Sequence, residues 1–137
     1  MNKKIILSSN SGWNIYNFRL GLVQELITHD YKVILICPED KYVKQLVSIG
    51  CDHYNVSIDR KGTSAYKDLK LFFRYLYLLK KIKPIYLFCY TIKPNIYASL
   101  AASFKPIKVI NNITGLGTSF INKSLMKYFL IFLYFIS

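Results

Sequence analysis

The sequence predicts an α/β fold, a Rossmann-like doubly wound parallel sheet, and three observations favour this class. Short apolar runs of strand length alternate with longer segments in which apolar residues recur at helical spacing. The short runs are apolar throughout, as are parallel strands covered on both faces. The 137 residues are 53% hydrophobic, which suffices for one domain with a substantial core.

The first strand is expected at residues 4–9, followed by a polar loop over 9–17 and a helix capped by Asn17. That helix has Phe18, Leu22 and Leu26 on one apolar face. A short helix is then expected to begin at the acidic residues Glu39 and Asp40 and to end at Gly50. The later strands are expected at 32–37, 52–58, 85–90 and 108–113, and the later helices at 64–81 and 94–104.

The formal net charge of +12 is unevenly distributed. Up to Asp68 there are nine basic and seven acidic residues, whereas the remainder has ten basic residues and no acidic one. This asymmetry favours an anionic partner, either anionic lipid, nucleic acid or a phosphorylated substrate. A lysine-rich, solvated surface without a partner is the alternative.

Three cysteines, Cys37, Cys51 and Cys89, are expected to be buried free thiols in a reducing compartment. The apolar run at residues 5–7 is too short for a signal peptide, so the expected location is cytoplasmic. Residues 124–137 are expected to form an apolar helix at a membrane or interdomain face. This run is too short to span a bilayer and meets no helix stop signal, which suggests a truncated chain.

Several common sites are missing from the sequence. It has no P-loop, no Gly-x-Gly-x-x-Gly after the first strand and no Asp-x-Asp. Neither His29 nor His53 has metal-ligand spacing to another histidine or cysteine, and both are expected to be structural or exposed. We therefore expect no metal and no bound cofactor.

Four polar loops follow the first, third, fourth and fifth strands, at residues 8–19, 59–63, 90–95 and 111–117. In an open parallel sheet these loops share the carboxyl edge, where ligands bind. Their amides, cations and glycines suit sugar hydroxyls and phosphates, with helix N-termini behind them. Asparagine and glycine are also ordinary turn residues, which is the alternative for each loop alone.

The helix at 64–81 carries a basic stripe made of Lys67, Lys70, Arg74 and Lys81, flanked by two apolar faces. One face contains Leu69, Phe72, Leu76 and Leu79, and the other contains Leu71, Tyr75, Leu78 and Ile82. Such a helix suits a membrane interface or a buried position with snorkelling cations, and both options stay open.

The four loops resemble, in order, motifs of the family 4 glycosyltransferases. They are SNSGWNIYNFR at 9–19, DRKGT at 59–63, YTIKPNIY at 90–97 and ITGLG at 113–117. The resemblance is closest to the branch that builds bacterial surface polysaccharides, such as capsule and lipopolysaccharide, and lipid-linked oligosaccharides. It implies the N-terminal, acceptor-binding half of a GT-B fold, with the C-terminal donor half and its Glu-x7-Glu motif absent.

In such enzymes a nucleotide-sugar donates its sugar to an acceptor, commonly undecaprenyl-linked, with retention and without a metal. Carried onto this sequence, the resemblance places Gly12 near the donor phosphates, and Gly115 and Gly117 on the cleft floor. The acceptor side would be lined by Asn10, Arg19, Asp59, Arg60, Tyr90, Lys93 and Asn95. Wider family members often have histidine at the position of Thr114, so no catalytic residue is assigned.

The leading hypothesis is thus an acceptor-binding half that is inactive alone and lies peripherally at the inner face of the cell membrane. Its donor half would be either missing from a truncated chain or supplied by a separate donor-domain chain. A non-enzymatic module for a basic membrane surface or nucleic acid is the alternative, although no nucleic-acid motif supports it and nucleic acid is not the expected partner. A nucleotide-sugar epimerase of related fold is a third option.

Overall fold

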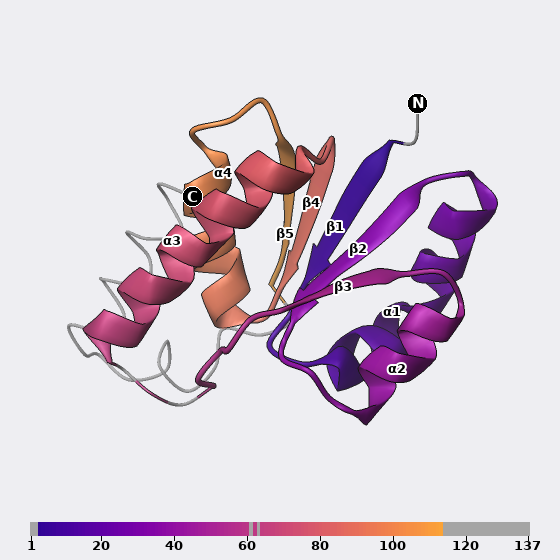
Figure 1. Ribbon diagram of the computed structural model, residues 1–137, viewed down its shortest axis with the longest axis horizontal. Helices are drawn as coiled ribbons and strands as arrows, with labels where there is room; N and C mark the ends of the chain where they lie inside the picture. Colours follow the sequence, from indigo (N-terminus) through magenta and orange to yellow (C-terminus); the bar gives the residue numbers. More distant parts are fainter. Residues whose placement is uncertain (1–2, 61, 63, 114–137) are drawn as a thin grey trace.

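The computed structural model describes residues 3–60, 62 and 64–113 (Figure 1). Its five strands form one parallel sheet with the order β3-β2-β1-β4-β5. The strands are β1 Lys4–Ser8, β2 Lys32–Cys37, β3 Asp52–Asn55, β4 Tyr86–Tyr90 and β5 Lys108–Asn112. The chain builds outward from β1 to β3, crosses back to place β4 beside β1, and continues to β5, which is the predicted doubly wound topology.

Helices cover both faces of this sheet (Figure 1). Helices α1 Gly12–Thr28 and α2 Lys41–Ser48 pack on one face, against side chains such as Leu7 and Leu35. On the other face lie α3 Ala65–Ile82, the π-helix η1 Pro94–Ala98 and α4 Ser99–Ala102. Because the central strands are buried on both sides, they are apolar between their first residue and the last positions of β1, as the sequence indicated.

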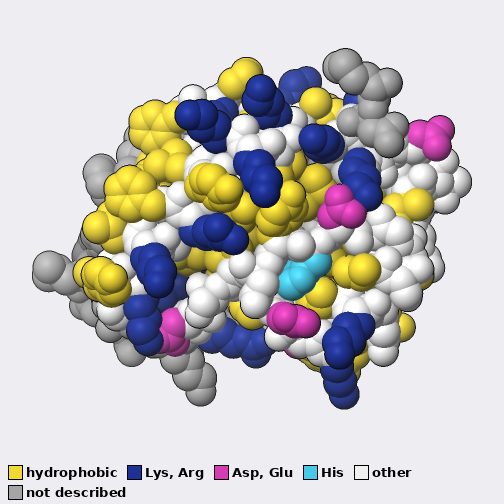
Figure 2. All heavy atoms as spheres, in the orientation of Figure 1, with side chains coloured by type: hydrophobic (Ala, Val, Ile, Leu, Met, Phe, Trp, Pro, Cys, Tyr) yellow, Lys and Arg dark blue, Asp and Glu magenta, His cyan; other side chains and the backbone are white. Residues whose placement is uncertain are grey.

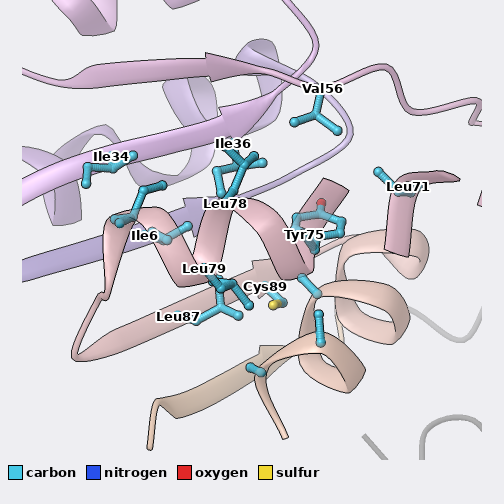
Figure 3. Packing of buried hydrophobic residues seen from close by; sticks show 14 of the residues in the cluster. Ile6, Ile34, Ile36, Val56, Leu71, Tyr75, Leu78, Leu79, Leu87 and Cys89 are labelled. Atoms are coloured by element: carbon cyan, nitrogen blue, oxygen red, sulfur yellow. The ribbon is translucent and has the colours of Figure 1, made fainter. Parts of the chain in front are cut away.

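The core beneath α3 is mostly apolar and includes the buried Tyr75 side chain (Figure 3). The Tyr75 hydroxyl lies 2.8 Å from Ser8 Oγ, and Ser8 Oγ donates a hydrogen bond of 2.9 Å to the Ile36 carbonyl. Burial raises the pKa of the Tyr75 phenol well above its ordinary value. The pair fixes α3 over the carboxyl ends of β1 and β2, since a displaced Tyr75 would leave its buried hydroxyl without a partner.

The first helix differs from its prediction. It begins at Gly12 rather than after Asn17, because Ser11 supplies the N-cap by accepting from the Asn14 N–H at 3.2 Å. The predicted loop at 9–17 is therefore mostly helix. Of the predicted apolar face, Leu22 and Leu26 pack partly buried against the core beside Val23, whereas the Phe18 side chain is 58% exposed and Ile15 is buried instead. The earlier start adds Ile15 to the helix, and packing on the sheet leaves Phe18 facing outward.

The other elements lie close to their expected ranges. Strand β3 ends at Asn55, three residues before its predicted end, although Val56 and Ile58 remain buried against α3. Asp40 caps α2, in agreement with the acidic start predicted there. The helix expected at 94–104 is two short pieces, η1 and α4. Residues 124–137 and the helix predicted for them lie outside the described residues.

Candidate functional site

The crevice between the carboxyl ends of β1 and β4 is the topological switch point of the sheet, because the chain winds in opposite directions on its two sides. Ligands of doubly wound sheets bind at this place. Here the Asn10 N–H donates a hydrogen bond of 3.2 Å to Thr91 Oγ1. The predicted loops after the first and fourth strands therefore meet.

Thr91 is a site residue that the sequence analysis missed as a special position. Its backbone has φ 70°, in the left-handed region that β-branched residues rarely adopt. A strained conformation of this kind costs about 1–3 kcal/mol and persists only where the surrounding structure holds it. The Asn10 hydrogen bond is one such contact. The only signal in the sequence was the position of Thr91 directly after a strand.

Arg19 and Tyr90 form a second link across the crevice. Arg19 lies on α1, and its guanidinium carbon is 4.7 Å from the centroid of the Tyr90 ring. Tyr90 ends β4 and is 2% exposed. Burial raises the pKa of Tyr90, and the neighbouring Arg19 charge and hydrogen bond oppose the rise. Two predicted acceptor-side residues thus lie in contact.

Lys93 is tied into a polar cluster rather than left as a free cation. Its Nζ donates to Asp68 Oδ1 at 2.6 Å and to the Gly62 carbonyl at 2.9 Å. The Tyr97 hydroxyl donates to the other Asp68 oxygen at 3.0 Å. The Lys93 and Asp68 side chains are only 14% and 17% exposed. This cluster joins the loop after β3 to α3 and η1, so its first consequence is to position that loop at the carboxyl edge.

Asp59 and Arg60, the other predicted residues of that loop, lie at its start. Asp59 accepts from the Gly62 N–H at 2.9 Å and lies 3.4 Å from Lys67 Nζ. Arg60 is exposed. The loop geometry therefore directs Arg60 to solvent while Asp59 stabilises the turn.

Asn95 sits at the base of the site in η1 and is 1% exposed. Its Nδ2 donates to the Asn112 carbonyl at 3.1 Å, which ties η1 to the end of β5. Among the described residues, neither Asn95 Oδ1 nor the buried Ser9 Oγ has a hydrogen-bond partner. Unpartnered buried polar atoms and π-helical turns are both concentrated at functional sites. The predicted Gly115 and Gly117 follow β5 and lie outside the described residues.

Gly12 has a packing role that the sequence did not predict. A methyl group there would lie 2.5 Å from Asp40 Oδ1 and 2.6 Å from Val43 Cγ2. Asp40 also accepts from the Trp13 N–H at 2.9 Å, so this carboxylate caps α1 as well as α2. The α1 N-terminus already has an anionic partner, which does not favour a phosphate at the same place. The phosphate role of Gly12 stays a prediction.

The comparison with protein families decides the assignment. A family model described as glycosyl transferase 4-like matches residues 4–136. The chain belongs to this family.

A curated relative of this glycosyltransferase 4-like chain comes from Campylobacter jejuni. It is N,N'-diacetylbacillosaminyl-diphospho-undecaprenol alpha-1,3-N-acetylgalactosaminyltransferase, 27% identical over 116 residues. The match covers 84% of this chain and 31% of that enzyme. The chain therefore spans about a third of the curated relative's length.

Solved structures share the fold. A glycosyltransferase from Rickettsia africae superposes with a TM-score of 0.67 at 16% identity, over 91% of this chain and 34% of that one. The UDP-GlcNAc 2-epimerase of Methanocaldococcus jannaschii superposes with a TM-score of 0.63 at 20% identity, over 100% of this chain and 38% of the epimerase chain. At these identities the likeness shows the fold alone, and the two enzymes have different activities.

Helix α3 of this glycosyltransferase 4-like chain presents all four predicted membrane-facing cations to solvent: Lys67, Lys70, Arg74 and Lys81. Beside them an apolar stripe is also exposed, formed by Tyr66, Leu69, Phe73 and Tyr77. Figure 2 shows hydrophobic and basic side chains interleaved over α3. The face that packs on the sheet is the one with Tyr75 and Leu78, so the opposite side of the helix is left uncovered by the described residues.

Within residues 3–60, 62 and 64–113, no helix is long and apolar enough to cross a bilayer. In the same part of the chain, no three His, Cys, Asp or Glu side chains gather where a metal ion could bind.

Proposed function

We propose that this chain is the acceptor-side half of a retaining, metal-independent glycosyltransferase that moves a sugar from a nucleotide-sugar to a lipid-linked or polysaccharide acceptor. The observation that supports it most is the meeting of predicted acceptor-side residues at the switch point, where Asn10 donates a hydrogen bond to Thr91 and Arg19 lies over the Tyr90 ring. The Campylobacter relative acts, by its name, on a diphospho-undecaprenol-linked sugar. An acceptor of the same class is the best candidate here.

The donor side is expected from a second Rossmann-like half, in the same polypeptide or in a separate chain. The 137 residues contain no Glu-x7-Glu. We infer that these residues bind acceptor but do not transfer sugar by themselves. The donor sugar and the linkage formed depend on that other half.

We place the chain at the cytoplasmic face of the cell membrane as a peripheral protein. The exposed stripe of α3 supports this, because aromatic side chains beside lysine and arginine suit an anionic interface. The same stripe is what favours the alternative, a non-enzymatic membrane-surface module. Selective binding of a lipid-linked sugar distinguishes the two, since only an acceptor-binding protein requires it.

The test is binding of the purified chain to neutral nanodiscs with and without an undecaprenyl-diphosphate-linked sugar, and to a nucleotide-sugar in solution. We expect binding to the lipid-linked sugar and none to the nucleotide-sugar. The variant Arg19→Gln should weaken acceptor binding at least about tenfold, because a contact to a charged group contributes roughly 1.5–3 kcal/mol. The control Lys44→Gln, on exposed α2, should leave it unchanged. Binding of nucleotide-sugar without lipid-linked sugar would contradict the acceptor-side assignment.

A further inference from the structure

A groove of about 900 Å³ lies between α3 and the segment that follows β3. Its inner wall is apolar and includes Val56, Ile58 and Leu71, all less than 9% exposed. Its outer rim carries the rings of Tyr66, Phe73 and Tyr77 on α3. The volume is within the range of small-molecule sites, and an apolar wall with few polar groups is typical of them. The groove does not include the crevice residues Asn10, Arg19 or Tyr90.

The charges around the groove leave a net positive end. Two carboxylates line it, but Asp68 is paired with Lys93, and Asp59 lies beside Lys67. Two further cations line it, Lys70 and Arg74. Among the described residues neither makes an ion pair, and Arg74 lies only over the Tyr77 ring, 5.6 Å from its centroid. Two unpaired cations beside an apolar wall suit a ligand with a hydrocarbon chain and an anionic head.

The groove is also joined to the candidate site. Its Asp59 and Asp68 belong to the polar cluster in which Lys93 holds the Gly62 carbonyl at the carboxyl edge. From Tyr66 to Tyr77 the helix rises about 16 Å, at 1.5 Å for each residue. A hydrocarbon chain of this length fits along the rim with its anionic head beside Lys70 and Arg74.

We propose that this groove binds the diphosphate and the first isoprene units of a polyprenyl diphosphate, the lipid part of the acceptor. The proposal rests on the proposed function and names the part of the acceptor that the crevice does not hold. The isoprene units lie against Val56, Ile58 and Leu71 under the rim rings. The diphosphate lies beside Lys70 and Arg74.

The probe is farnesyl diphosphate, a short, water-soluble isoprenoid diphosphate, titrated into the purified chain while amide NMR shifts are recorded. Shifts are expected at residues 55–59 and 66–77, with an affinity at least about tenfold above that of inorganic diphosphate. Phe73→Ser and the double change Lys70→Gln with Arg74→Gln should each weaken binding about tenfold. The matched controls, Phe104→Ser at another exposed phenylalanine and Lys44→Gln on α2, should change it less than about twofold.

The proposed ligand of the groove is wrong if farnesyl diphosphate and inorganic diphosphate bind with equal affinity and Phe73→Ser changes neither affinity. It is also wrong if the chain binds phosphatidylglycerol vesicles and farnesyl diphosphate does not reduce that binding, since the stripe would then hold a bilayer surface and nothing more specific. The nanodisc experiment separates the two proposals. If Phe73→Ser and the double variant at Lys70 and Arg74 still bind the lipid-linked sugar normally, the ligand proposed for the groove is wrong and the acceptor-side function stands. If the chain binds polyprenyl diphosphate no more tightly with a sugar than without, the function fails and the groove stands.

Discussion

Adding one methyl group at Gly12 tests the close packing of α1 on α2. In the structure that methyl would lie 2.5 Å from Asp40 Oδ1 and 2.6 Å from Val43 Cγ2, closer than such atoms approach. Gly21 is the matched control on the same helix, because a methyl there would have no neighbour within 4 Å. Both changes are Gly→Ala in α1, so they differ mainly in the space available.

The two substitutions should move stability in opposite directions. Alanine at Gly21 gains roughly 0.5–1 kcal/mol, because alanine loses less backbone freedom than glycine when a helix forms. Alanine at Gly12 forces a shift in a packed contact, which costs about 1–3 kcal/mol. A displaced Asp40 also weakens its caps on both helices, each worth about 1 kcal/mol. With these costs added and alanine's helix preference subtracted, we expect Gly12→Ala to lower the free energy of unfolding by about 2–4 kcal/mol.

Urea unfolding followed by circular dichroism measures both variants against the parent chain. The double variant Gly12→Ala with Val43→Ala provides a further check, since removing the valine methyls relieves part of the overlap. Its loss of stability should be smaller than the sum of the two single losses. If Gly12→Ala proves as stable as Gly21→Ala, close packing does not explain why residue 12 is a glycine. The role near the donor phosphates would then be the better explanation.

Three other predictions concern buried polar groups. Ser8→Ala should lower the free energy of unfolding by about 1–3 kcal/mol, because it leaves the buried Tyr75 hydroxyl without its hydrogen-bond partner. Tyr75→Phe should lower it less, and thermal melts of both variants would compare them. Lys93→Met should lower the free energy of unfolding by about 2–3 kcal/mol, because it leaves the mostly buried Asp68 without its cation. It should also speed amide hydrogen exchange at Gly62, whose carbonyl Lys93 holds. The double variant Asp68→Asn with Lys93→Met should recover part of the lost stability, and full additivity of the two changes would argue against a coupled pair. The three cysteine thiols should resist alkylation of the folded chain at pH 8, because burial raises their pKa values from 9.0 to about 11 or 12. Between pH 9 and those values the folded chain holds more protons than the unfolded chain, so the free energy of unfolding should fall as pH rises above 9, and a flat profile there would contradict buried thiols.

The sequence alone determined the fold class and the order of its elements. Continuous apolar runs such as 32–37 can be satisfied only by burial on both faces, so the parallel sheet followed from local pattern. Topology then required the loops after the strands to share one edge, and the hydrogen bonds from Asn10 to Thr91 and from Lys93 to Gly62 join three of them there. The family assignment, made from four loop motifs, is also confirmed.

Tertiary structure decided what individual side chains do at that edge. The resemblance placed Lys93 on the acceptor side, and its pairing with Asp68 depends on a contact across 25 positions that no local pattern contains. The start of α1 depended on Ser11 being presented as a cap, and the role of Gly12 depended on Asp40 arriving from α2. Periodicity ranks apolar positions on a helix but does not fix its rotation on the sheet, which packing sets. The exposed rim of α3 became recognisable only once Tyr75 and Leu78 were placed in the core.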